Sequence, residues 1–229
     1  MNIFLPSALL TVLLVLPAFA ADMVPGMSGA GTMRLPVKNM SEMRFTHMIK
    51  QKYDFSCGAA AIAALLTYHY EMPSDEAGIL KAMYETGDKE KIHKAGFSML
   101  DMKKYLQSVG FTAEGYRASI DKLAAADIPA IVLINNKGYM HFVVVKGVSS
   151  DHVLLGDPAT GARIVTRDAF NKSWNGILFV ITSHTETAQP TFNVASEWQR
   201  LRAPVVAGMG SAPLSNLALD TALTPNYYR

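Results

Sequence analysis

A single cysteine, Cys57, stands between a polar stretch and an apolar one in this chain of 229 residues. The residues QKYDFS precede it, and the small apolar residues GAAAIAALL follow it. The apolar run predicts a helix buried on all sides that begins at Cys57, with Ser56 or Asp54 as its cap. Helix N-termini carry partial positive charge, which stabilises a thiolate. Cys57 is therefore a candidate nucleophile, with an inert core position and an intermolecular disulfide as open alternatives.

Gln51 lies six residues before Cys57, which is far enough for a loop to fold back beside the helix start. Its side-chain amide and the backbone N–H of Cys57 would then both donate to one oxyanion. Gln51 is thus a candidate oxyanion-hole residue. Taken alone, Gln51 is better explained as a surface residue.

His141 lies on a predicted strand, in the segment YMHFVVVKG, and Asp157 follows the next predicted strand, in the segment GDPATG. If residues 147–151 form a hairpin loop, Lys146 faces His152, and His141 then lies opposite Asp157. Opposed residues of an antiparallel pair are close enough for a carboxylate to orient an imidazole. A slip of one residue would send the two side chains to opposite faces. Alone, His141 is explained as a core histidine and Asp157 as a turn residue.

The other residues that could bind ligands show no such grouping. The spacing of the histidines and acidic residues is not typical of a metal site, and one cysteine excludes a four-thiolate zinc site. The segment GMSGAG follows no predicted strand and opens no predicted helix, unlike a phosphate-binding loop. We expect no metal and no cofactor. The net charge is +2 with scattered basic residues, which argues against nucleic acid as a partner.

The two ends of the chain differ in composition from its middle. Residues 1–20 carry an apolar stretch that ends in Ala-Phe-Ala, as in a cleavable signal peptide, so we expect a periplasmic protein that does not stay in the membrane. Residues 21–43 are rich in Met, Gly and Pro and are expected to form an extended arm. We expect the compact domain at residues 44–184 and a mostly irregular tail at 185–229.

Within residues 44–184 the predicted helices come first and the strands follow. Helices are expected at 57–70, after Ser74, at 99–109, after Ser119 and at 167–174, and strands at 111–116, 130–134, 139–146, 152–155, 162–165 and 176–182. This order predicts the α+β class, with N-terminal helices packed on an antiparallel meander.

Three segments together resemble the C39 peptidases, papain-like cysteine proteases best known as leader-processing domains of bacteriocin exporters. QKYDFSCGAAAIAALLTY is similar to the cysteine motif of the family, and YMHFVVVKGV and LLGDPATG are similar to its His and Asp motifs in the same order. The resemblance spans about residues 46–182. It implies a papain-like fold with Cys57 as nucleophile, His141 as general base, Asp157 as its orienter and Gln51 in the oxyanion hole.

No segment of the printed sequence resembles the transporter membrane domain or the ATPase domain of those exporters, and the expected signal peptide would place the active site outside the inner membrane. We therefore expect a periplasmic cysteine endopeptidase that cleaves an exported protein or peptide and serves a secretion or amyloid-assembly system. Its partners would be that polypeptide and components of the secretion machinery. Two alternatives stay open: a related module that binds exported substrates without cutting them, and acyl transfer to an amine in place of hydrolysis.

Overall fold

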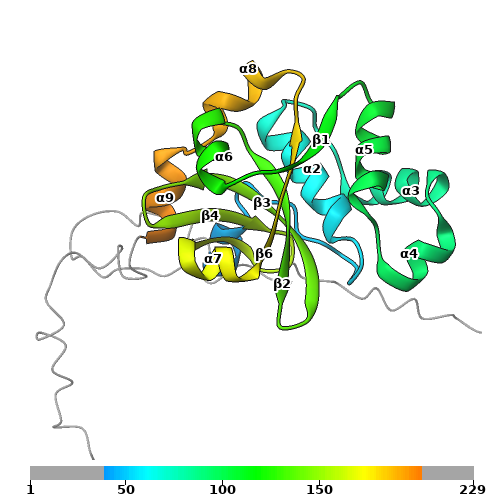
Figure 1. Cartoon of the computed structure of the whole chain (residues 1–229), viewed down its shortest axis with the longest axis horizontal. Coiled ribbons are helices and arrows are strands. Elements are labelled where there is room, and N and C mark those ends of the chain that lie inside the picture. Colours follow the sequence, from blue (N-terminus) through cyan, green and yellow to red (C-terminus); the bar gives the residue numbers. More distant parts are fainter. Residues whose placement is uncertain (1–38, 203–229) are drawn as a thin grey trace, which may run out of the picture. The chain divides into compact units, whose positions relative to one another are not determined.

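The computed structural model describes residues 39–202 (Figure 1). The predicted signal peptide, most of the predicted arm and residues 203–229 therefore lie outside the described part of the chain. The helices are α1 (Met40–Arg44), α2 (Cys57–His69), α3 (Glu76–Thr86), α4 (Lys89–Ala95), α5 (Met99–Ser108), α6 (Ile120–Ala126), α7 (Arg167–Ser173), α8 (Thr185–Ala188), the 3-10 turn η1 (Gln189–Thr191) and α9 (Ala195–Arg202). The strands are β1 (Ala113–Arg117), β2 (Ala130–Asn136), β3 (Tyr139–Val148), β4 (His152–Asp157), β5 (Gly161–Thr166) and β6 (Trp174–Ile181).

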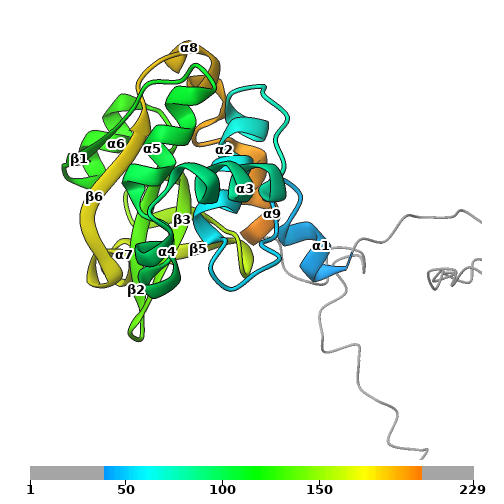
Figure 2. The same ribbon diagram turned by 90° about the vertical axis from the view of Figure 1, so that its right-hand side faces the viewer.

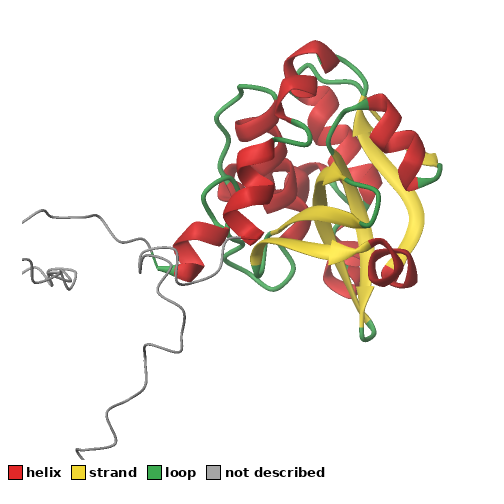
Figure 3. Cartoon of the chain, turned by 90° about the vertical axis from the view of Figure 1, so that its left-hand side faces the viewer, coloured by secondary structure: helices red, strands yellow, loops and turns green. Residues whose placement is uncertain are grey.

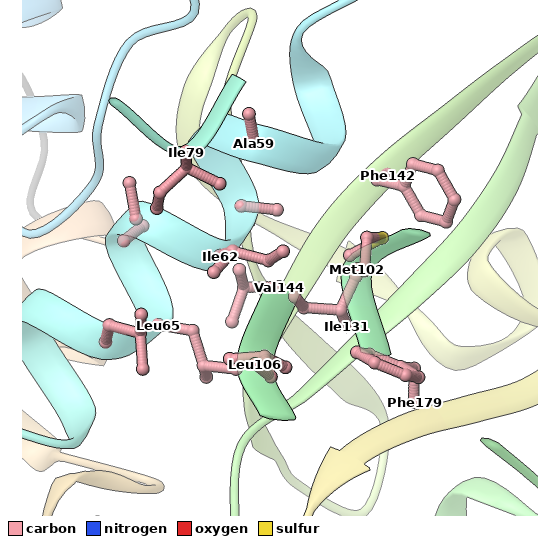
Figure 4. Packing of buried hydrophobic residues seen from close by; sticks show 14 of the residues in the cluster. Ala59, Ile62, Leu65, Ile79, Met102, Leu106, Ile131, Phe142, Val144 and Phe179 are labelled. Atoms are coloured by element: carbon pink, nitrogen blue, oxygen red, sulfur yellow. The ribbon is translucent and has the colours of Figure 1, made fainter. Parts of the chain in front are cut away.

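Helix α2 lies at the centre of the larger apolar cluster, as its sequence predicts. Ala61, Ile62 and Ala63 are fully buried, although consecutive residues point in different directions around the helix. They pack against α3, α5 and the sheet, where Val144 of β3 joins the same cluster (Figure 4). Because every side of α2 is covered by protein, the position of its first residue is held by packing along the whole helix.

The other helices follow local capping signals with two differences. Ser98 and Asp101 form the reciprocal capping box that starts α5. Asp75, and not the predicted Ser74, caps α3, because its carboxylate accepts from the backbone N–H of Gly78. Helix α4 was not predicted, since its sequence KEKIHKA buries one large apolar residue, Ile92, and shows no clear apolar stripe.

The six strands form one antiparallel sheet in the order β1-β6-β2-β3-β4-β5. The expected meander holds from β2 to β5. The last strand, β6, departs from it by returning across the sheet to pair between β1 and β2. Helices α2, α3, α4 and α5 gather on one side of the sheet, and α6 and α7 lie on another (Figures 1 and 2). Figure 3 shows the resulting split into a helical part and a strand part, which is the predicted α+β arrangement.

Residues 185–202 are more ordered than expected for the tail at 185–229, in which one or two helical turns are predicted only in the segment SEWQRLRAPVV. They form α8, η1 and α9, and α9 lies beside the strands of the β3–β4 region (Figure 1). Ala188, Phe192 and Glu197 are buried, so the packed unit continues past the expected boundary at residue 184. The composition of this stretch is polar, and its order comes from contacts with the sheet that the local sequence does not reveal. No helix within residues 39–202 is both long and apolar enough to cross a bilayer.

Candidate active site

Cys57 is the first residue of α2 and is 8% exposed, at the edge of a cavity of about 950 Å³. Ser56 precedes the helix, but its hydroxyl makes no cap hydrogen bond to the helix backbone. That hydroxyl donates to the buried carboxylate of Glu76 and approaches the carbonyl of Tyr53 at 2.8 Å. The Ser56 oxygen accepts from the backbone N–H of Tyr53 at 3.2 Å, so its acceptor position is used by the loop and not by the helix backbone.

Glu76 at the start of α3 anchors the loop that leads into Cys57. It is 2% exposed, and its two carboxylate oxygens accept from the backbone N–H of Lys52 at 2.9 and 3.1 Å. Together with the Ser56 hydroxyl, these bonds tie both ends of the loop to one side chain. From the sequence, Glu76 is predicted only as an acidic residue in the first turn of a helix, which is a common surface feature. No sequence pattern therefore indicates that Glu76 anchors the loop.

His141 and Asp157 meet as a buried pair. His141 Nε2 lies 2.8 Å from Asp157 Oδ1, and the two residues are 4% and 3% exposed. Asp157 also accepts from the backbone N–H of Ala159 at 2.8 Å and of Thr160 at 3.2 Å, and Arg163 Nη2 lies 3.3 Å from its second oxygen. The carboxylate is therefore held from several directions and presents a fixed acceptor to the imidazole.

The ionisation of this pair follows from those contacts. Burial alone would lower the pKa of His141, but hydrogen bonds to Asp157 and Cys57 and their charges raise it to about 9. Burial would raise the pKa of Asp157, but the hydrogen bond and charge of His141, aided by Ala159 and Arg163, lower it to about 2. At neutral pH His141 thus holds its proton, which is the form that pairs with a thiolate and can protonate a leaving amine.

The second ring nitrogen of His141 is available to Cys57. His141 Nδ1 is buried and makes no hydrogen bond of good geometry within the described residues, while the Cys57 side chain is close enough to affect the pKa of the imidazole. Catalytic hydrogen bonds are often loose before substrate binds. The ring of Tyr139 lies 5.9 Å from the His141 ring, and its hydroxyl donates to the carbonyl of Asp54 at 2.6 Å. Tyr139 therefore links the His141 strand to the Cys57 loop.

The strand register that brings His141 and Asp157 together differs from the predicted one. Val148 pairs with Val153, and Val144 pairs with Gly156. Asp157 is the residue after Gly156, so this register places it beside Val143 and not directly opposite His141. The predicted pairing was wrong by two residues, because the loop is shorter than expected and β3 contains a bulge. An even shift keeps both side chains on one face, and the two residues become diagonal neighbours.

Gln51 lies next to the Asp157 turn, since its backbone N–H donates to the carbonyl of Pro158 at 2.9 Å. Its side-chain Nε2 donates to the carbonyl of Tyr53 at 2.9 Å. An amide nitrogen carries two protons, so one remains for an oxyanion. The oxyanion-hole role of Gln51 stays a prediction.

Two cavities meet near the site. The cavity at Cys57 is lined by apolar side chains that include Leu133, Met140 and Phe142. Its charged lining residues have both signs: Lys91, Lys94, Lys104, Asp54, Asp88 and Asp101. A second cavity of about 550 Å³ shares Phe55 and Phe97 with the first. Within residues 39–202, no three His, Cys, Asp or Glu side chains are grouped in a way that could hold a metal ion.

The profile of the Peptidase C39 family matches residues 46–186. The chain belongs to the peptidase C39 family. The predicted family, the papain-like α+β fold and the assignment as a cysteine peptidase are thereby confirmed.

The chain is similar to proteins described as probable functional amyloid protease FapD. It is 41% identical to the one from Pseudomonas fluorescens over 75% of this chain and 76% of that protein, and 43% identical to the one from Pseudomonas aeruginosa over 69% and 70%. A solved double glycine motif protease from an AMS/PCAT transporter, in complex with the leader peptide, superimposes with a TM-score of 0.50 and 27% identity. That match covers 58% of this chain and 89% of that structure.

Proposed function

We propose that this peptidase C39 family member is a periplasmic endopeptidase that cleaves an exported polypeptide of a functional-amyloid secretion system. The observation that carries the proposal is the buried His141–Asp157 pair beside Cys57 at the start of α2. The identity of 41–43% to relatives described as functional amyloid proteases supports the choice of system. The apolar cavity at Cys57 supports an extended or helical polypeptide as the substrate.

The proposed reaction is acyl transfer to water. In the resting state His141 is an imidazolium that has already taken the thiol proton of Cys57, and the Cys57 thiolate attacks a peptide carbonyl carbon. The backbone N–H of Cys57 and the amide of Gln51 stabilise the resulting oxyanion. The protonated His141 then gives its proton to the leaving amine, and a water molecule activated by the same imidazole releases the acyl group from Cys57. Asp157 holds the imidazole in the orientation that these transfers need.

The test compares exported proteins from cells that carry the wild-type chain with those from cells that carry Cys57→Ala. One exported protein is expected to remain longer by a defined segment in the variant, and mass spectrometry gives the cleaved bond. Tyr70→Phe is the matched control, since it changes one buried polar group of the same helical part and leaves Cys57 in place.

Four outcomes would contradict the proposal or one of its parts. Equal processing of all exported proteins in both strains would contradict it. A partner that both forms bind but neither shortens would also contradict it, since a binding module behaves in this way. A product joined to an amine, in place of a free carboxylate, would identify acyl transfer to an amine. Fractionation of the mature chain with cytosolic markers would overturn the periplasmic location.

A further inference from the structure

Strand β3 contains a bulge at Lys146 that interrupts its pairing with β4. Val148 pairs with Val153, Val145 pairs with Leu155, and Lys146 between them has no partner on β4. Val145 and Val148 are three residues apart, yet both pack into the same apolar cluster. In a regular strand, residues three apart point to opposite faces. The extra residue therefore reverses the alternation of side chains along the rest of β3.

This reversal decides whether Asp157 can reach His141. Past the bulge Val144 pairs with Gly156, so Asp157 follows on the same face as Val143 and His141. Without the extra residue, the Val148–Val153 register would continue and place Asp157 opposite Val144, on the other face from His141. The 2.8 Å contact between the imidazole and the carboxylate therefore depends on the bulge.

One residue far along the chain binds the backbone of the bulge. The backbone N–H of Asn193 donates to the carbonyl of Lys146 at 2.9 Å, and Asn193 Oδ1 accepts from the backbone N–H of Val148 at 2.7 Å. Gly147 allows this close approach, since a Cβ there would lie 2.5 Å from Asn193 Oδ1 and 3.1 Å from Trp198 Nε1. The backbone groups on either side of Gly147 thus find partners outside the sheet.

The Lys146 side chain is held by the same part of the chain. It is 1% exposed, and its Nζ lies 2.6 Å from Glu197 Oε2. Glu197 Oε1 in turn lies 2.7 Å from His47 Nδ1. Residues of the same segment also contact α2, the helix that begins at Cys57. The hydroxyl of Thr191 lies 2.6 Å from Nδ1 of His69 at the end of that helix. Residues 188–202 therefore contact both the strand that carries His141 and the helix that carries Cys57.

We propose that residues 188–202, here called the brace, are a positioning element that holds the bulge of β3 and so sets Asp157 beside His141. This inference rests on the proposed function. The brace lies wholly beyond the region matched by the family profile, which ends at residue 186. None of its residues lines the cavity beside Cys57. They act on the reaction through the register of β3 and β4.

The test follows the titration of the His141 imidazole by NMR in the full chain, with His141→Gln to assign its signal and Asp157→Asn as the reference for a lost partner. In the wild type we expect a midpoint near 9. Asn193→Gly keeps the positive φ of 54° and the backbone donor but removes the Oδ1 acceptor. We expect it to lower the midpoint by about one unit or more, as Asp157→Asn does, and to reduce kcat about tenfold with KM unchanged.

Two further variants separate positioning from general destabilisation. Asn193→Asp keeps an acceptor at the same place and is expected to restore the wild-type midpoint. Tyr70→Phe removes a buried hydrogen bond to the carbonyl of Ile181, far from the bulge, and is expected to lower the melting temperature without moving the midpoint. If Asn193→Gly does not fold, Gly147→Ala takes its place, since the added Cβ separates the brace from β3.

The outcomes for the brace and for the proposed function can be told apart. A wild-type His141 that titrates near an ordinary histidine would contradict the catalytic pair itself. A wild-type midpoint near 9 that stays unchanged in Asn193→Gly and Gly147→Ala would overturn the positioning role. Failure of Asn193→Asp to restore the midpoint would overturn it as well.

Discussion

The N-terminus of α2 and the β3–β4 hairpin each carry part of the proposed site, and different interactions hold them. Cys57 is held by the packing of one helix, whose residues Ala59 to Leu66 are almost wholly buried in the larger apolar cluster. His141 and Asp157 are held by a strand register, which depends on the bulge at Lys146 and its contacts with residues 188–202. A nucleophile can be placed by local sequence, whereas a base and its orienter on neighbouring strands need contacts from distant segments.

The two regions also shift the pKa of a buried histidine in opposite directions. His141 gains a carboxylate partner, and its pKa rises to about 9. His69 at the end of α2 has a hydroxyl partner, and burial, followed by the charges of Lys146 and His47, lowers its pKa to about 3. The strand region thus keeps an ionised imidazole in a buried position, and the helix region keeps a neutral one as part of the core.

Removing the imidazole on the strand side should have the largest effect. His141→Gln keeps most of the side-chain volume but removes the general base and acid, so we expect kcat/KM to fall about 10³-fold or more. Cleavage of the exported substrate by the purified chain measures it. His152→Gln on β4 is the control and should keep wild-type activity. Activity of His141→Gln within tenfold of the wild type would contradict the assignment.

On the helix side, Ile62→Ala should cost stability without changing the chemistry. Ile62 is fully buried, and the cavity left by the truncation should lower the free energy of unfolding by about 3 kcal/mol. Urea denaturation measures the loss. At a temperature where the variant is folded, the pH profile of cleavage should match the wild type. A shifted profile would mean that packing around α2 also sets the His141–Asp157 geometry.

The two histidines predict opposite effects of pH on stability. The folded pKa of His141 is raised, so its contribution of about 2 kcal/mol, allowing for screening, is present below pH 6.5 and lost as pH rises from about 6.5 to 9. The folded pKa of His69 is lowered, so stability falls as pH drops from about 6.5 toward 3. Denaturation at pH 4, 6.5 and 9.5 should therefore give a maximum near pH 6.5.

Variants assign each limb of that curve to one histidine. His141→Gln should flatten the alkaline limb only, and His69→Gln the acid limb only. An alkaline limb that persists in His141→Gln would show that another group raises its pKa on folding.

The smallest of these effects should come from Glu76, which anchors the loop before Cys57. Glu76→Gln keeps one acceptor but loses the charge, so the bonds to Lys52 and Ser56 weaken and stability should fall by about 1.5 kcal/mol. Thermal unfolding measures it. Glu85→Gln on the same helix breaks an exposed pair with Lys81 at 3.9 Å and should change stability by less than about 0.5 kcal/mol. If Glu76→Gln and Glu85→Gln lower the stability by the same amount, Glu76 does not stabilise the loop before Cys57.

The sequence by itself determined the parts of this protein that depend on neighbours along the chain. The apolar run after Cys57 predicts α2, because helix formation and burial are decided within about a dozen residues. The alternation and apolar content of residues 139–146 and 152–155 predict the two strands of the hairpin. The order of the cysteine, histidine and aspartate motifs was enough to identify the family, the α+β class and a cysteine peptidase.

Only the tertiary structure decided how His141 and Asp157 meet. Counting from an assumed loop placed them directly opposite, whereas the shorter loop and the bulge at Lys146 make them diagonal neighbours on one face. The partners of that bulge, Asn193 and Glu197, come from a polar stretch some 45 residues further along the chain. Side chains along a strand alternate with a period of two residues, so the register decides which of them share a face. Here the register depends on backbone contacts with a distant segment, which the local sequence pattern does not encode.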